Sequence, residues 1–162
     1  MGYTFVPLRL KYPLAGLLAM VHIKDEGSHF DAPIETVWKY LNADDHGPAH
    51  KSTRNQQMKP LSETSFILTQ EQNMNGQWVK TSNRITVFPP IAVSIEILEG
   101  PLAGSKMINV YTPKGNKTGI DVYGEFVSQQ IPAAQLEPAV RGNLETVFSE
   151  DSAALKSFSP KK

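Results

Sequence analysis

The chain has 162 residues and a mass of 17.9 kDa, which is the size of one domain. Sixteen Lys and Arg balance sixteen Asp and Glu, so nucleic acid is not expected as a partner, because phosphate-binding proteins carry an excess of basic residues. The sequence has no cysteine, which excludes disulfides, thiol nucleophiles and Cys-ligated iron–sulfur clusters. This composition also fits a cytoplasmic protein, which is the localisation we expect.

The N-terminal segment, residues 1–20, is predicted to be an arm ahead of the domain. Its apolar run over residues 14–21 is about eight residues long, whereas a membrane-spanning helix needs about 20, so no transmembrane segment is expected. Residues 22–25 offer no small-residue cleavage site of the kind that ends a signal peptide. We therefore expect an arm or short helix lying on a domain over residues 21–158, with a tail over 159–162.

The domain is predicted to begin with a strand over residues 21–31 and a short helix over 34–41. The apolar residues of this helix recur at the i, i+3, i+4, i+7 spacing of one face: Ile34, Val37, Trp38 and Leu41. Pro33 suits its first turn. The polar, turn-rich segment 42–50 can form only a short second helix.

The middle of the chain is predicted to form five strands, over residues 64–74, 77–88, 91–98, 105–112 and 118–128. Turn signals separate them. Asn75-Gly76 is the strongest, because a type I′ turn needs positive φ at both central positions. Apolar and polar residues alternate most clearly over 91–98 and 120–126, as in an antiparallel sheet with one covered face.

The C-terminal segment is predicted to be the helix that covers this sheet. Apolar residues recur at spacings of three and four over 136–158, and Asp151 falls on the same stripe. Pro138 and Gly142 predict a bent or late-starting first turn. The fold class is therefore α+β: a curved antiparallel sheet wrapped around a long C-terminal helix, with two short helices after the first strand. A ligand is expected between sheet and helix.

Three segments in this order resemble the START-like or SRPBCC superfamily, which has the helix-grip fold and includes polyketide cyclases. They are residues 30–38 at the first strand-to-helix junction, Pro89-Pro90 before a strand, and the hairpin over 99–105. The resemblance covers roughly residues 21–158. It implies the fold, but the superfamily holds binders, carriers and enzymes, so the chemistry of the site has to decide the activity.

A narrower resemblance is to the catalytic domain of Rieske-type non-haem iron oxygenases, which is also a helix-grip domain. That family has two iron-binding histidines in an Asn/Asp-rich segment and, in some members, a third ligand in a Val-Phe-x-Glu-Asp phrase. The matching residues here are Asn42, Asp45, His46 and His50, and then segment 147–151. The two histidines are four positions apart where the family usually has five, and without cysteine the chain cannot build a Rieske cluster.

His46 and His50 are candidate metal ligands, because imidazoles four residues apart on a helix point in one direction. Asp151 is the candidate third ligand, because an unpaired acid on the inward stripe of a helix is costly. Together they form the two-His-one-carboxylate set of non-haem Fe(II) sites, so a divalent metal, Fe or Zn, is the cofactor that this set would take. In the alternative, Gly47 and Pro48 break the helix, segment 42–50 is a solvated loop and Asp151 accepts hydrogen bonds from loop amides.

The predicted ligand pocket has a mainly aromatic lining with a few polar groups that would orient a ligand. The residues expected to line it are Trp38, Phe66, Trp78, Asn109, Tyr111, Tyr123, Phe126, Leu144 and Phe148. The alternative is that these aromatic side chains fill the core. Arg84 is expected on the outer face, and Glu125 would be a general base only if it were buried.

These observations favour a domain that binds or carries a small hydrophobic molecule, either a lipid or an aromatic compound, between the sheet and the last helix. Two enzymatic alternatives stay open. One is a mononuclear non-haem-metal oxygenase-like enzyme that uses His46, His50 and Asp151. The other is a polyketide cyclase- or dehydratase-like enzyme that uses acid–base chemistry in the same pocket.

Overall fold

A seven-stranded antiparallel sheet and one long helix dominate the structure, a computed structural model that describes residues 18–159. The strands are β1 (Ala19–Phe30), β2 (Thr53–Pro60), β3 (Ser65–Met74), β4 (Gln77–Phe88), β5 (Ala92–Glu99), β6 (Lys106–Lys114) and β7 (Lys117–Ser128). The helices are α1 (Ile34–Leu41), α2 (His46–Ala49) and α3 (Ala133–Ser157). In this part of the chain, no helix is both long and apolar enough to cross a membrane.

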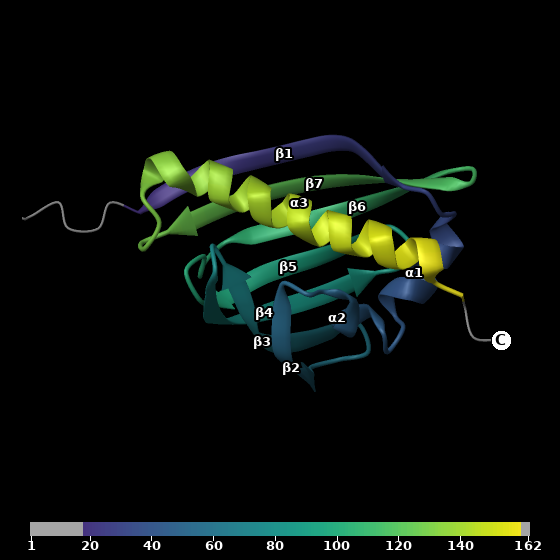
Figure 1. Cartoon of the computed structure of the whole chain (residues 1–162), viewed down its shortest axis with the longest axis horizontal. Helices are drawn as coiled ribbons and strands as arrows, with labels where there is room; N and C mark the ends of the chain where they lie inside the picture. The colour runs from purple at the N-terminus through teal and green to yellow at the C-terminus, as the bar shows by residue number, and fades with distance from the viewer. Residues whose placement is uncertain (1–17, 160–162) are drawn as a thin grey trace, which may run out of the picture.

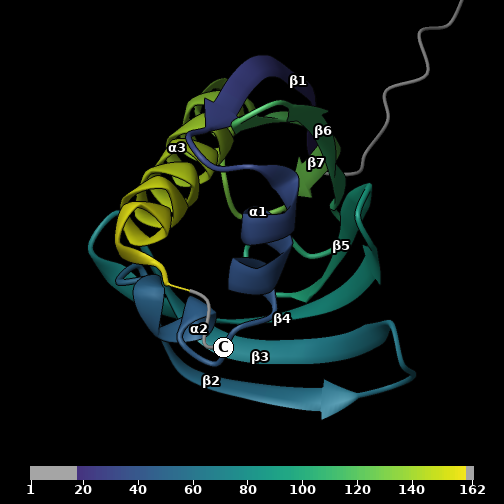
Figure 2. The same ribbon diagram turned by 90° about the vertical axis from the view of Figure 1, so that its right-hand side faces the viewer.

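The sheet curves around α3. Its strands pair in the order β1-β7-β6-β5-β4-β3-β2, so β1 and β2 are the two edges. Figure 1 shows α3 running obliquely across the sheet, and Figure 2 shows the sheet bending from β1 round to β2 with α3 across its open side. α3 packs on β1, β7 and α2. The predicted fold class, a curved sheet around a long C-terminal helix, is confirmed.

Two apolar clusters attach α3 to the sheet. One joins the first half of α3 to β1 and β7 through Leu136, Val140, Ile23 and Phe126. The other joins Leu155, near the end of α3, to α1 and the neighbouring strands. α1 is held by its apolar face and by two hydrogen bonds. The Trp38 indole donates to the Pro90 carbonyl at 2.7 Å, and the Thr118 hydroxyl donates to the Ala32 carbonyl at 2.8 Å.

Three features differ from the sequence-based prediction. β2 is absent from that prediction, because its sequence is polar and does not alternate, as an edge strand allows. α3 begins at Ala133 and contains Pro138, so its start is not late. β1 begins at Ala19, within the predicted arm. The rest of that arm, residues 1–17, and residues 160–162 of the predicted tail lie outside the described residues.

Candidate metal centre

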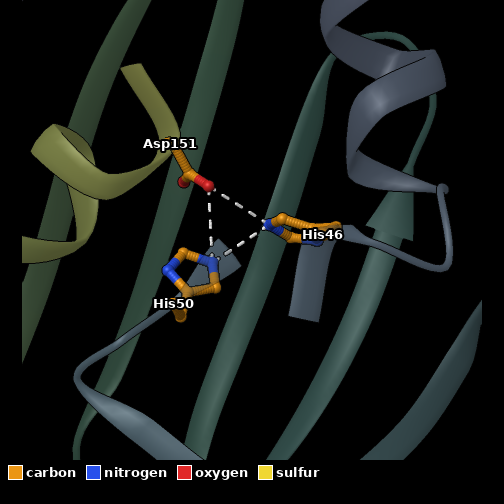
Figure 3. A group of neighbouring side chains, drawn as sticks. All are labelled: His46, His50 and Asp151. Atoms are coloured by element: carbon orange, nitrogen blue, oxygen red, sulfur yellow. Dashed lines mark hydrogen bonds and ion pairs between the residues drawn. The ribbon is translucent and has the colours of Figure 1, made fainter. Parts of the chain in front are cut away.

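α2 lies against the C-terminal half of α3, although the two helices are far apart in the sequence. His46 is the first residue of α2 and His50 is the residue that ends it, so one helical turn brings both imidazoles to the same side. Gly47 and Pro48 lie within this turn and do not break it, because proline is tolerated in the first turn of a helix. Asp151 reaches the two rings from α3 (Figure 3).

The three predicted metal ligands converge on one point. His46 Nε2 lies 3.1 Å from His50 Nε2, and each of these nitrogens lies 3.3 Å from Asp151 Oδ1. Asp151 is buried, with 8% of its surface exposed. Figure 3 shows the three side chains pointing toward one another. The structure therefore provides the geometry that the sequence suggests, while metal binding itself stays a prediction.

Glu150 fixes the orientation of the His50 ring. Its Oε2 lies 3.1 Å from His50 Nδ1, and its two oxygens accept hydrogen bonds from the backbone N–H and the hydroxyl of Ser52, each at 2.8 Å. Because an ionised carboxylate only accepts hydrogen bonds, the proton lies on Nδ1 of His50. A neutral His50 ring therefore presents the lone pair of Nε2 to His46 and Asp151.

Tyr40 also holds Asp151 in place. Its hydroxyl donates to Asp151 Oδ1 at 2.8 Å, and its ring packs edge-on against His46 with 4.9 Å between centroids. Burial, reinforced by the charge of Asp151, raises the pKa of the Tyr40 phenol far above its usual range. The phenol therefore stays protonated and keeps donating to the carboxylate.

The cluster has more lone pairs than protons. With both imidazoles neutral, only the His46 proton is available for the three contacts among His46 Nε2, His50 Nε2 and Asp151 Oδ1. The last two atoms then face each other at 3.3 Å as two acceptors. Among the described residues, neither Glu150 nor Asp151 pairs with a lysine or arginine. A nearly buried pair of carboxylates needs a compensating cation, which is either an imidazolium or a metal ion.

An open hollow of about 520 Å³ lies beside His50. Its lining comes from α2, the turn after it, β2 and the start of β4: Gly47, Pro48, His50, Lys51, Thr53, Arg54, Asn55, Gln56 and Trp78. His50 belongs both to this lining and to the cluster, so the hollow and the candidate metal centre adjoin at this residue.

The inner side of the sheet and helix carries seven of the nine residues predicted to line a pocket: Trp38, Phe66, Asn109, Tyr111, Phe126, Leu144 and Phe148. Trp38, Tyr111 and Phe126 are buried and fill the core, as the alternative interpretation holds. The other four are partly exposed, so they are the ones that a bound molecule can touch.

Tyr123 and Trp78 are not among these seven residues, and for Tyr123 this corrects the prediction of a pocket-lining residue. Tyr123 is 37% exposed and its hydroxyl donates to Glu26 at 2.6 Å, a hydrogen bond that raises the pKa of Tyr123 to about 12. Trp78 is also 37% exposed, and the guanidinium of Arg54 lies 4.2 Å from its ring centroid. Tyr123 therefore belongs to the outer surface of the sheet, whereas Trp78 contributes to the lining of the open hollow beside His50.

Two charged candidates also lie on the outer face. Glu125 is exposed and lies 3.8 Å from His22, so it is not a buried general base. Arg84 pairs with Glu96 at 2.8 Å on the outer face, where it was expected. The supporting residues of the cluster, Tyr40, Ser52 and Glu150, were not among the predicted site residues. Of these, only Glu150 carried a signal, through its place in the Glu-Asp pair of segment 147–151.

No protein-family model matches this sequence, and no curated protein matches it. Solved structures do match. Zhui aromatase/cyclase from Streptomyces sp. R1128 aligns with a TM-score of 0.72 and 13% identity over 85% of this chain and 94% of that one. Norcoclaurine synthase from Thalictrum flavum aligns with a TM-score of 0.65 and 10% identity over 99% of both chains. Ara h 8.0201 aligns with a TM-score of 0.66 and 11% identity over 86% of this chain and 99% of that one.

These likenesses define the class of architecture, a curved sheet gripping a long helix. The chain shares the helix-grip fold with these three proteins. Identities this low show the fold alone, so they do not assign a substrate or a reaction. None of the three proteins is described as a Rieske-type oxygenase, and that narrower resemblance gains no support from them.

Proposed function

We propose that this protein binds one divalent metal ion through His46, His50 and Asp151 and acts as a mononuclear metal enzyme on a small, mostly apolar molecule. The observation that carries the proposal is the convergence of two imidazole nitrogens and one carboxylate oxygen at 3.1–3.3 Å. A divalent ion at their centre would balance the charges of Glu150 and Asp151 and would turn the opposed lone pairs into ligands.

The separations suit a metal ion. With bonds of about 2.1 Å, separations of 3.1–3.3 Å correspond to ligand–metal–ligand angles of roughly 95–104°. These angles lie between octahedral and tetrahedral values, so the set supports Fe(II) or Zn(II) with further positions open. A bound ion of this kind would polarise an oxygen atom of water or substrate.

The surrounding residues have defined parts in this proposal. Glu150 holds the Nδ1 proton of His50, so that Nε2 stays free to ligate. Tyr40 holds Asp151 Oδ1 with its hydroxyl. A substrate would contact the partly exposed inner side chains, such as Phe66 and Phe148. As an oxygenase-like enzyme the protein would take electrons from a separate reductant, because its sequence has no cysteine for a Rieske cluster.

Metal analysis of the purified protein tests the proposal. We expect about one Fe or Zn ion per chain after reconstitution. With Co(II) in place of Fe or Zn, we expect the absorption spectrum of an ion that is bound by protein ligands. His50→Ala and Asp151→Asn should abolish both. The matched control is His22→Ala, because His22 is exposed beside Glu125 and is not one of the three candidate ligands. Equal metal content in all four proteins, or none in the wild type after reconstitution, would refute a metal centre.

A second candidate is a carrier that binds a small hydrophobic molecule without chemistry. It is supported by apolar side chains that face the inner side of the sheet yet are partly exposed, including Phe66, Leu68, Ile85 and Ile95. Norcoclaurine synthase, which shares the fold, was solved with dopamine and hydroxybenzaldehyde. Metal-free protein that co-purifies with a lipid or aromatic compound, identified by native mass spectrometry, would favour this carrier. A cyclase- or dehydratase-like enzyme has less support, because Glu125 faces outward.

A further inference from the structure

The open hollow beside His50 has a lining of one charge sign. Lys51 and Arg54 are cationic, and none of the residues that the structure describes in the lining is an aspartate or a glutamate. Apart from His50, the other lining side chains are small or uncharged polar groups and the ring of Trp78. The volume of about 520 Å³ lies within the range of roughly 300–1,000 Å³ of small-molecule sites. A hollow with this size and this charge suits an anion.

An irregularity in β2 brings four successive residues to the hollow. Side chains of a regular strand alternate between two faces, yet residues 53–56 all line the hollow. The pairing of β2 with β3 shifts between Arg54 and Gln57. Within this shift Asn55 has a φ of 54°, in the left-handed region that few residues other than glycine and asparagine adopt. Bulges and backbone outliers of this kind are concentrated at functional sites.

The guanidinium of Arg54 is held in a fixed plane at the hollow. It lies 4.2 Å from the centroid of the Trp78 ring, and its Nε donates to Glu71 Oε2 at 2.8 Å. Asn55 also donates to this oxygen, so Glu71 is itself held in place. Because Glu71 bonds Nε, the N–H groups of the two terminal nitrogens can serve another acceptor. A planar, preorganised guanidinium matches the two oxygens of a carboxylate.

Hydrogen bonds also hold Lys51 and join the two walls of the hollow. Lys51 Nζ donates to the Pro48 carbonyl at 3.2 Å, which keeps the ammonium group beside α2. From β2, the Gln56 amide donates to the Thr53 hydroxyl at 2.8 Å and to the carbonyl of Gly47 in α2 at 3.4 Å. Both cationic groups therefore come from segments that are already fixed, which lowers the entropic cost of binding an anion there.

We propose that this hollow binds a small organic carboxylate, whose oxygens accept hydrogen bonds from Arg54 and Lys51 and whose planar apolar body lies against Trp78. Two positive charges less that of Glu71 leave one, which a carboxylate balances and a phosphate dianion does not. Trp78 is 37% exposed, so part of its ring is open to apolar contact. The inference goes beyond the proposed function, because it adds a second molecule beside the candidate metal centre and holds with or without metal.

NMR titration of the ¹⁵N-labelled protein with matched probes tests this inference. The probes are benzoate, its neutral isostere benzamide, and inorganic phosphate. Benzoate should shift the indole N–H signal of Trp78 and the backbone signals of residues 51–56. It should leave the indole signal of Trp38 unchanged, because that ring is buried and bonded to Pro90. Benzoate should bind at least about 10-fold more tightly than benzamide, which lacks the charge.

Two outcomes of this titration would contradict the proposal. Equal binding of benzoate and benzamide would overturn the role of the cationic groups. Tighter binding of phosphate than of benzoate at the same signals would overturn the assignment of a carboxylate.

Substitution of each cationic residue tests its part in binding. Arg54→Gln and Lys51→Gln should each weaken benzoate binding about 3–10-fold and leave benzamide binding unchanged, because each removes one charge. Arg84→Gln is the matched control and should bind benzoate as the wild type does. Arg84 also bonds a glutamate on the adjacent strand at 2.8 Å, but it does not line the hollow. If Arg54→Gln does not fold, Lys51→Gln carries the test, and unchanged benzoate binding in the folded variants would overturn the inference.

Trp78→Leu tests the apolar contact. In the wild type, benzoate should bind about fivefold more tightly than acetate, because only benzoate has a ring to place against Trp78. The variant should reduce this advantage to about twofold or less. An advantage that persists in Trp78→Leu would overturn the placement of the ligand body.

Asp151→Asn keeps this test separate from that of the metal centre. Asp151 is a candidate metal ligand but does not line the hollow, so with a chelator present the variant should bind benzoate as the wild type does. If the wild type binds benzoate only after loading with Zn(II), and Asp151→Asn does not bind it, the carboxylate ligates the metal. That result would overturn the role of Arg54 and Lys51 and leave the metal centre standing. A protein that binds no metal but prefers benzoate would support this inference and refute the metal centre.

Discussion

Replacing Glu150 with glutamine isolates the part of the site that orients His50. The glutamate accepts three hydrogen bonds, from His50 Nδ1 and from the N–H and hydroxyl of Ser52. In Glu150→Gln the amide keeps the size of the side chain but puts an NH₂ group where one oxygen was. If that group faces His50, the ring has to accept at Nδ1 and carry its proton on Nε2, the atom that would ligate the metal. Loss of such an orienting partner weakens metal binding by about 10–100-fold, which is about 1.4–2.7 kcal/mol.

A competition titration with a chromophoric chelator measures this change as a ratio of Kd values for Zn(II) or Co(II). Glu145→Gln, on the exposed face of the same helix, is the matched control and should bind metal as the wild type does. Without metal, Glu150→Gln should lose little folding stability. Its lost hydrogen bonds are offset by removal of one of two neighbouring buried negative charges. Equal Kd values in Glu150→Gln and Glu145→Gln would refute the orienting role of Glu150.

Three further changes test other parts of the structure. Tyr40→Phe removes the hydrogen bond to Asp151 and should cost about 1.5–3 kcal/mol in urea unfolding; an unchanged midpoint would show that this bond adds nothing. Phe148→Ala removes the ring stacked on Phe30 at 5.1 Å and should cost about 2–4 kcal/mol, whereas a smaller loss with weaker binding of an apolar probe would mean that the ring lines an open ligand space. Tyr111→Phe tests pH dependence: burial raises the pKa of this phenol, so the folded protein keeps the proton that the unfolded chain loses near pH 10. Stability present below about pH 10 should then fall by about 1.4 kcal/mol per pH unit above it, and urea unfolding of the variant should lack this component.

The strands and the long helix could be predicted from the sequence because their signals are local. Alternation and turn signals predicted the bounds of six of the seven strands to within one or two residues. The turn at Asn75-Gly76 has the positive φ values, 52° and 85°, that its sequence demands. β2 carried no such signal, because an edge strand with few buried side chains can be polar on both faces. The start of α3 depends on its packing against β1 and β7, and the proline inside it does not reveal that packing.

Only those site residues that a local spacing or a helical periodicity identifies could be predicted from the sequence. The spacing of His46 and His50 is local, and Asp151 falls on the inward stripe of a periodic helix. Tyr40 reaches the site from α1, and no short-range pattern connects it to a residue 111 positions later. Tyr123 is a different case. Its alternation with Val122 already placed it on the polar face, and its aromatic character outweighed that signal in the prediction.

The pairing of His50 with α3 has a consequence for how the chain unfolds. His50 and Glu150 are 100 positions apart, so an ion held by His50 and Asp151 would act as a removable cross-link around most of the domain. It would tie the end of α3 to the segment that leads into β2, the edge strand farthest along the sheet from β1. Ligands that bind only the native state stabilise it in proportion to the logarithm of their concentration. We therefore expect a chelator to release the α2–α3 end first and to speed hydrogen exchange there, while the β1–β7 ladder stays protected.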